Sequence, residues 1–276
     1  MKRLPSYVVK DEINALRDGM CAPIRGLLSP DVWSRRAIDA VKKASSNENL
    51  FNKAIEPFGF DVKELIGYTD LANWMRGLLA VSKEGKLLFV YAHSGESEPF
   101  VVQGVRQLEC VEGRNRWHYW VLPSEPWGIA SVQETSKCVF LVENELIALH
   151  MRLAFEAQQM SWQSGPDADS SIFSPSPVFI AAPPNGRFDE YSINRLRNHI
   201  VICVHSSSAS CVKIMCACAN SLSESHVEHE NINFEYSVEA MEKLSFFERR
   251  WLAVDFEVVM KQNYSKLFER WVSGLS

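Results

Sequence analysis

Acidic and hydroxyl-bearing side chains follow two strongly apolar segments of the chain. Glu143 comes directly after the segment 138–142, and a His-Ser-Ser-Ser run, 205–208, comes directly after 200–204. A carboxylate is a ligand that Mg²⁺ prefers, and a run of serines before a helix can cap that helix or bind a phosphate group. Glu143 can also be an ordinary helix N-terminal carboxylate that the helix dipole favours. What these side chains could do depends on whether the fold brings them together.

The order of the predicted elements places both segments in one sheet. Regular alternation of strand and helix is typical of a parallel sheet with crossover helices. In such a sheet, ligands bind at the carboxyl ends of the strands, so we expect Glu143 and the 205–208 run at the same edge. The predicted strands are 138–142, 178–182, 200–204 and 232–236, and the predicted helices between them are 145–160, 189–197 and 209–222.

These residues resemble the Toprim domain of bacterial and phage primases, topoisomerases and some nucleases. In that family one strand ends in a glutamate, and a later strand ends in Asp-x-Asp followed by a helix. The resemblance places Glu143 on the glutamate and His205 and Ser207 on the two aspartates, with Ala209 as the one retained residue of the later motif. Residues 78–100 also look like the β-rich segment that precedes Toprim in primases of phages and plasmids.

The departures from the family pattern bear on its chemistry. In Toprim proteins the glutamate and the aspartates hold Mg²⁺, which stabilises charge on a phosphoryl group or strand end. A histidine and a serine do not replace two aspartates, so Glu143, His205 and Ser207 are expected to be vestigial, with no bound metal and no cofactor. The resemblance implies a non-catalytic protein that acts as a nucleic-acid-associated or assembly subunit of a phage or mobile element. The alternative is an accessory factor that binds protein without nucleic acid.

The fold class that we predict is α/β, with a Toprim-like parallel sheet preceded by a helical arm and a small antiparallel β segment. The antiparallel segment is predicted because apolar runs at 78–81 and 87–91 flank a polar turn that contains Gly85. Helices are also predicted at 8–20, 31–44 and 61–66. The expected parts are a helical N-terminal region at 1–74, a β-rich segment at 75–136, a Toprim-like domain at 137–237 and C-terminal helices, 238–250 and 251–272, within 238–276.

The candidate nucleic-acid surface lies in the predicted strand 117–122. Arg114 and Arg116 precede Trp117, and arginine beside an exposed aromatic ring is typical of single-strand binding by phosphate contact and base stacking. The same aromatic residues could instead fill the core or anchor a protein interface. The partners that we expect are therefore single-stranded nucleic acid and another protein. The basic residues Arg35, Arg36, Lys42 and Lys43 are further candidates for phosphate contact.

Cysteines and histidines provide weaker candidate sites. Cys216 and Cys218 are followed by His226 and His229, but this spacing matches no common zinc template. Cys203 shares a strand face with His205, yet it lies inside an apolar run where an exposed thiolate is not expected. We therefore predict buried thiols rather than a metal or nucleophile site, and Cys216, Cys218, His226 and His229 have no assigned role.

Composition narrows the class of protein. The 276 residues carry a net charge of −5 and 46% hydrophobic residues, close to the average of globular domains, which excludes a disordered or collagen-like chain. The chain contains seven cysteines and shows no secretion signal, as is typical of a reducing compartment. No apolar stretch is long enough to span a membrane. We therefore expect a cytoplasmic protein with no membrane partner.

Overall fold

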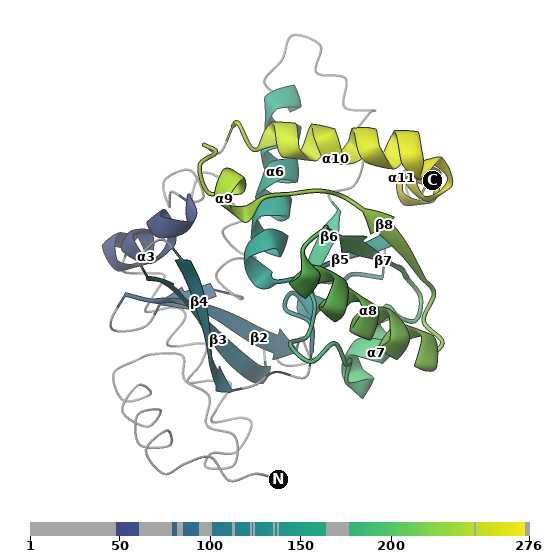
Figure 1. Cartoon of the computed structure of the whole chain (residues 1–276), viewed down its shortest axis with the longest axis horizontal. Helices are drawn as coiled ribbons and strands as arrows, with labels where there is room; N and C mark the ends of the chain where they lie inside the picture. The colour runs from purple at the N-terminus through teal and green to yellow at the C-terminus, as the bar shows by residue number, and fades with distance from the viewer. Residues whose placement is uncertain are drawn as a thin grey trace. The chain divides into compact units, whose positions relative to one another are not determined.

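The computed structural model shows two compact units, residues 1–130 and 131–276, and each is described by itself (Figure 1). The predicted helices 8–20, 31–44 and 61–66, and the basic residues near the N-terminus, lie outside the described residues. The structure describes residues 48–60, 79–81, 85–93, 101–111, 114–121, 123, 125–134, 136, 138–163, 177–245 and 247–273.

The first unit contains a four-stranded antiparallel sheet in the order β1-β2-β3-β4. The predicted hairpin is confirmed, because Val81 of β1 lies opposite Leu87 of β2. Helix α3 and the 3₁₀ turn that follows it were not among the predicted elements. The strands are β1 (Leu79–Val81), β2 (Leu87–His93), β3 (Val101–Val111) and β4 (Arg114–Val121), and the helical segments are α3 (Glu48–Ile55) and η1 (Glu56–Phe58).

The core of the first unit forms around β2. All five side chains of 87–91 are buried, so both faces of this strand are covered. Phe89 packs edge-on against the buried Trp127, with ring centroids 5.2 Å apart. A strand that is apolar on both faces belongs in the interior of a sheet, and β2 indeed lies between β1 and β3.

The second unit is built on a four-stranded parallel sheet in the order β6-β5-β7-β8. The prediction that the strands at 138–142, 178–182 and 200–204 are parallel strands of one sheet is confirmed, with 138–142 between the other two. The chain leaves β5 towards one side to form β6 and then returns to the other side to form β7, so the connections change direction between β5 and β7. The strands are β5 (Cys138–Val142), β6 (Val178–Ala181), β7 (Ile200–His205) and β8 (His229–Asn233).

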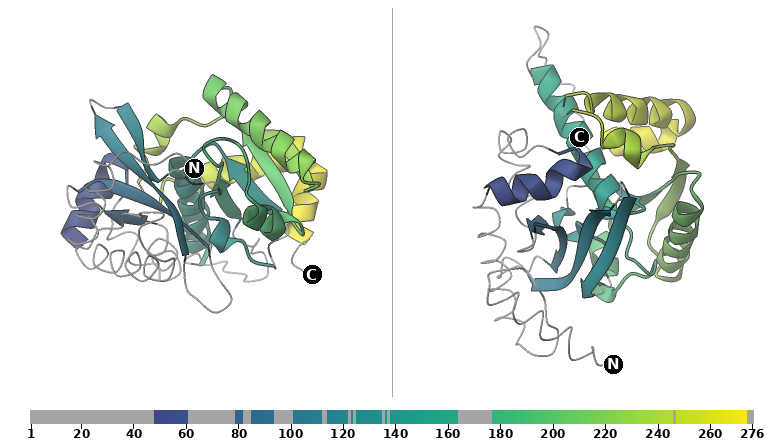
Figure 2. Two further views of the ribbon diagram at one scale, coloured as in Figure 1. Left: turned by 90° about the horizontal axis from the view of Figure 1, so that it is seen from below. Right: turned by 60° about the vertical axis from the view of Figure 1, so that its left-hand side comes forward.

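Helices cover both faces of the parallel sheet (Figure 1, Figure 2). Phe140 of β5 meets the rings of Phe256 and Trp271 on one face. The next residue, Leu141, points to the opposite face and pairs in register with Cys203, where α8 packs on β7. The helices are α6 (Glu145–Gln163), α7 (Glu190–Leu196), α8 (Ala209–Glu224), α9 (Val238–Met241), α10 (Arg250–Asn263) and α11 (Ser265–Val272).

A cluster of aromatic rings joins the C-terminal helices to the sheet. Phe256 of α10 is fully buried at its centre. Because α10 also packs along α6, the C-terminal helices share a core with the sheet. The ring centroids of Phe140, Phe155, Phe179, Phe234 and Trp271 lie 5.3, 6.0, 5.8, 5.0 and 6.4 Å from that of Phe256.

Three predicted boundaries in this unit were wrong. The helix predicted at 238–250 ends at Met241 as α9, and α10 begins only at Arg250, because a turn in which Ser245 donates to Glu248 from its backbone N–H and hydroxyl lies between them. The fourth strand spans His229–Asn233 rather than 232–236, because its pairing is set by the register of β7, in which Ile202 lies opposite Glu230. The last helix is divided at Tyr264, whose backbone leaves the helical conformation at φ −136 and ψ 42. At this interruption of the helix, the hydroxyl of Tyr264 accepts a hydrogen bond of 2.8 Å from the backbone N–H of Asn233 at the end of β8.

Candidate functional site

The carboxyl ends of β5 and β7 meet where the strand order reverses. Glu143 follows β5, and its Oε1 accepts a hydrogen bond of 2.7 Å from the Ser210 hydroxyl in the first turn of α8. Asn144 caps α6, because its side-chain oxygen accepts from the backbone N–H groups of Leu146 and Ile147. The residues after β5 and β7 are therefore in contact, as the sequence predicted for this edge.

The serine run after β7 forms the N-terminal cap of α8. Ser208 is the capping residue, since its hydroxyl accepts from the backbone N–H of Cys211 at 3.1 Å. The hydroxyls of Ser206 and Ser210 lie 3.4 and 3.3 Å from that of Ser208, so they extend a hydroxyl network towards Glu143. Of the two interpretations of this run, the structure therefore supports helix capping.

His205 and Ser207, which the Toprim resemblance places on the two aspartates, form hydrogen bonds with β8 and with the segment after it. His205 Nε2 lies 2.9 Å from the side-chain oxygen of Asn231. The backbone N–H and the hydroxyl of Ser207 both donate to Glu235 Oε2, at 3.2 and 2.8 Å. The hydrogen bond to Glu143 comes instead from Ser210, five residues beyond His205.

Glu235 and Tyr236 belong to this edge but were not among the predicted site residues. The Tyr236 hydroxyl lies 3.7 Å from the Cys211 thiol. Burial, and then Cys211, raise the pKa of Tyr236, and the charge of Glu143 contributes in the same direction. We took candidate site residues from the positions directly after each predicted strand. Because the predicted strand 232–236 included both residues, neither one was a candidate. With β8 ending at Asn233, the same rule points directly at Glu235.

The donor set at this edge does not suit Mg²⁺. A magnesium site needs convergent carboxylate oxygens, but Glu143 and Glu235 are each bound by serine donors from different parts of the 207–210 segment. In the part of the chain that the structure describes, no group of three or more His, Cys, Asp or Glu side chains could hold a metal ion. The side chains at the strand ends can exchange hydrogen bonds with one another and with polar ligands.

The thiols of the second unit are divided between interior and surface. Burial, with Cys216 as a second contribution, raises the pKa of Cys203 to about 12, so this thiol is protonated and is not a nucleophile at neutral pH. Burial also raises the pKa of Cys218. The prediction of a buried thiol was wrong for Cys216, which is exposed because it lies on the side of α8 opposite Cys218. His229 donates from Nδ1 to the backbone oxygen of Val227.

The antiparallel sheet places Arg116 and Trp117 on opposite faces. Trp117 is half-buried against Phe89, with ring centroids 5.5 Å apart, and the guanidinium carbon of Arg106 lies 3.9 Å from the centroid of its ring. The Trp117 ring therefore packs against other side chains of the first unit, on the face of the sheet opposite Arg116. Arg114 begins β4 opposite Val111, and its side chain lies outside the described residues.

Arg116 lies instead in a group of basic side chains. It is exposed and lies opposite Glu109 in the register of β3 and β4. Glu109 forms an ion pair with Lys86, and its Oε2 lies 3.7 Å from His118 Nε2. The hydrogen bond from Lys86 is the main cause that lowers the pKa of Glu109, and the charges of His118 and Arg116 add to it. We call Lys86, Arg116 and His118 the basic face; among the described side chains, these two cations and one imidazole ring surround the carboxylate of Glu109.

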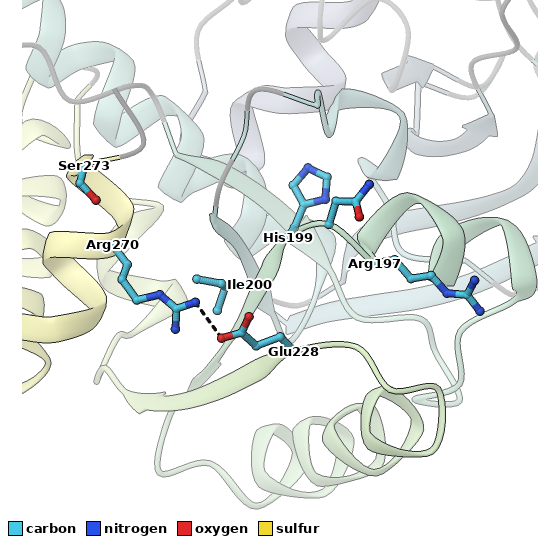
Figure 3. A pocket seen from close by; sticks show the side chains of 7 residues that line it. Arg197, His199, Ile200, Glu228, Arg270 and Ser273 are labelled. Atoms are coloured by element: carbon cyan, nitrogen blue, oxygen red, sulfur yellow. Dashed lines mark hydrogen bonds and ion pairs between the residues drawn. The ribbon is translucent and has the colours of Figure 1, made fainter. Parts of the chain in front are cut away.

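A pocket of about 380 Å³ lies at the amino end of β7, away from Glu143. Arg270 and Glu228 form an ion pair of 2.7 Å across it. The buried His199 donates a hydrogen bond from Nε2 to the backbone oxygen of Gln133 at 2.9 Å. In Figure 3 the guanidinium of Arg197 points away from Arg270, so the two arginines do not converge on one position. The full lining is Arg197, Asn198, His199, Ile200, Glu228, Arg270 and Ser273.

No protein-family model, curated protein or solved structure matches this chain. Among the described helices, none combines the length and the apolar character needed to cross a membrane.

Proposed function

We propose that the chain is a non-catalytic, Toprim-like protein that acts as a nucleic-acid-associated subunit. The strand order supports this proposal, because it sets Glu143 beside the end of β7, where the family's aspartates would stand. The donor set supports the non-catalytic part, because His205 and Ser207, at the positions that the resemblance places on aspartates, bring no carboxylate to Glu143.

The observation that carries the nucleic-acid part is the basic face of the antiparallel sheet. Lys86 and Arg116 are cations at neutral pH, and His118 lies 3.7 Å from Glu109, which supplies one negative charge among them. The whole chain carries −5 at neutral pH, so attraction to phosphate has to come from a local surface of this kind. A few exposed cations give weak binding that is strongly reduced by salt.

The experiment is a titration of labelled single-stranded oligothymidylate with the full chain, followed by fluorescence anisotropy at several salt concentrations. Each neutralised phosphate contributes about 0.7 to the log–log salt slope for single strands. Arg116→Ala should therefore weaken binding and reduce the slope by about 0.7. The matched control is Arg187→Ala, which removes an exposed arginine from the second unit and should leave the slope unchanged.

Two results would count against this function. One is the absence of binding at low salt, and the other is binding that Arg116→Ala and Arg187→Ala reduce equally. In either case we would turn to the second candidate, an accessory factor that binds protein without nucleic acid. The observation that favours this candidate is the exposure of three large apolar side chains, Phe247, Trp251 and Val258, on and next to α10.

A further inference from the structure

Helix α10 has an apolar stripe on the side opposite its buried face. Ala253, Phe256 and Met260 are buried against the second unit. Trp251 and Val258 are 57% and 41% exposed, and Phe247, in the turn before the helix, is 54% exposed. The half-buried Val254 lies between Trp251 and Val258. The stripe therefore runs 247, 251, 254 and 258, with spacings of four, three and four residues.

This spacing is the a/d pattern by which helices pair in coiled coils. With Trp251 and Val258 at a, Val254 falls at d, and Phe247, in the turn before α10, continues the stripe at its amino end. The residues that α10 buries in its own unit then fall at c and f, the positions farthest from a partner helix. One sequence thus presents two apolar faces, of which the unit itself covers only the inner one.

The charges beside the stripe indicate which partner fits it. In the same register Arg250 is at g and Asp255 is at the following e. In a parallel pair of helices, a g residue of one helix meets the e residue five positions further along the other. Two copies of α10 would therefore form two Arg250–Asp255 contacts. An antiparallel pair with Trp251 opposite Val254 would set Arg250 beside Glu257 but also Glu248 beside Asp255, so its attractions and repulsions would cancel.

We propose that α10 pairs in parallel with α10 of a second copy of this chain, about a twofold axis along the helices. The guanidinium of Arg250 already lies beside the stripe, 4.9 Å from the centroid of the Trp251 ring. The contact covers about two heptads, so we expect it to bury less than the roughly 1,200 Å² at the lower limit of standard interfaces and to be weak and reversible. This inference rests on α10 alone and is independent of nucleic-acid binding.

The experiment is sedimentation velocity on the full chain over a concentration series from low to high micromolar. The expected result is a reversible monomer–dimer equilibrium. Trp251→Glu should give a monomer over the whole series, with an unchanged far-ultraviolet circular dichroism spectrum. The matched control is Val212→Glu, which places the same charge at an apolar side chain of α8 that is 44% exposed and should leave the dimer intact.

Charge reversal tests the parallel register. Arg250→Glu alone and Asp255→Arg alone should each raise the dissociation constant about tenfold, because each replaces two attractions by two repulsions. The double variant should restore the wild-type value. A wild-type chain that is monomeric throughout, a dimer that survives Trp251→Glu, or a double variant that remains as weak as the single ones would each overturn the proposal.

Discussion

Replacing Phe256 by Ala tests whether the C-terminal helices are part of the core of the second unit. Phe256 is fully buried on α10, and five other rings lie within 6.4 Å of it, centroid to centroid. They come from β5, α6, β6, the segment after β8, and α11. Removal of this ring leaves a cavity between the sheet and α10 that the neighbouring aromatic side chains, which are rigid and mutually packed, cannot close.

The expected loss is large. A fully buried phenylalanine costs about 3–5 kcal/mol when it is replaced by alanine. The edge-to-face contacts around Phe256 put this variant near the upper end of that range, since such pairs contribute beyond the buried area. With a denaturant dependence of roughly 2–3 kcal/mol per molar urea, the unfolding midpoint should fall by more than about 1 M.

The assay is urea unfolding followed by near-ultraviolet circular dichroism, which reports on the packed aromatic rings. Phe256→Leu provides a milder second variant, and its midpoint should lie between those of wild type and Phe256→Ala. The control is Phe268→Ala on α11, where a half-buried ring meets Trp271; its loss should be less than half as large. A loss below about 1 kcal/mol for Phe256→Ala would refute the view that α10 is part of this core.

Three further predictions follow from single contacts. Glu109→Gln removes the carboxylate that pairs with Lys86, so the affinity for labelled single-stranded DNA at low salt should rise; an unchanged or lower affinity would argue against the basic face. Cys203 has its pKa raised to about 12 from 9.0, so the folded state holds its proton longer than the unfolded chain does. Stability should therefore fall as the pH rises from about 9 towards 12, and urea midpoints of Cys203→Ala should lack this component. Gly186→Ala should cost about 2–4 kcal/mol in a thermal or urea melt, because φ is 68° and the new Cβ would lie 2.5 Å from that of Ala217. Adding Ala217→Gly should recover part of that loss, and no recovery would show that the contact is not the cause.

The parallel sheet could be predicted from the sequence because its strands are short apolar runs separated by amphipathic helices. The segments 138–142 and 200–204 are buried on both sheet faces, so every residue in them is apolar and the pattern is unambiguous. The fourth strand is different. As an edge strand it has exposed residues at most positions, and the apolar pattern therefore pointed to the more hydrophobic residues that follow it.

The candidate sites were predicted only in part, for reasons of local geometry. The contact between Ser210 and Glu143 depends on how the first turn of α8 is oriented, which the residue types do not determine. In the antiparallel sheet, neighbouring residues of one strand point to opposite faces, so Arg116 and Trp117 could not form one surface while both belong to β4. The side chains grouped with Arg116 come from three places: Glu109 from β3, His118 from β4 itself, and Lys86 from the residue before β2.

The polar character of β8 has a consequence for the behaviour of the chain in concentrated solution. An open edge of a parallel sheet is a template on which a strand of another molecule can add, and apolar edges promote such growth into aggregates. β8 has partly or fully exposed polar side chains at four of its five positions, His229, Glu230, Asn231 and Asn233. In addition, the Tyr264 hydroxyl accepts a hydrogen bond from the backbone N–H of Asn233. The chain thereby discourages edge-to-edge growth of the sheet.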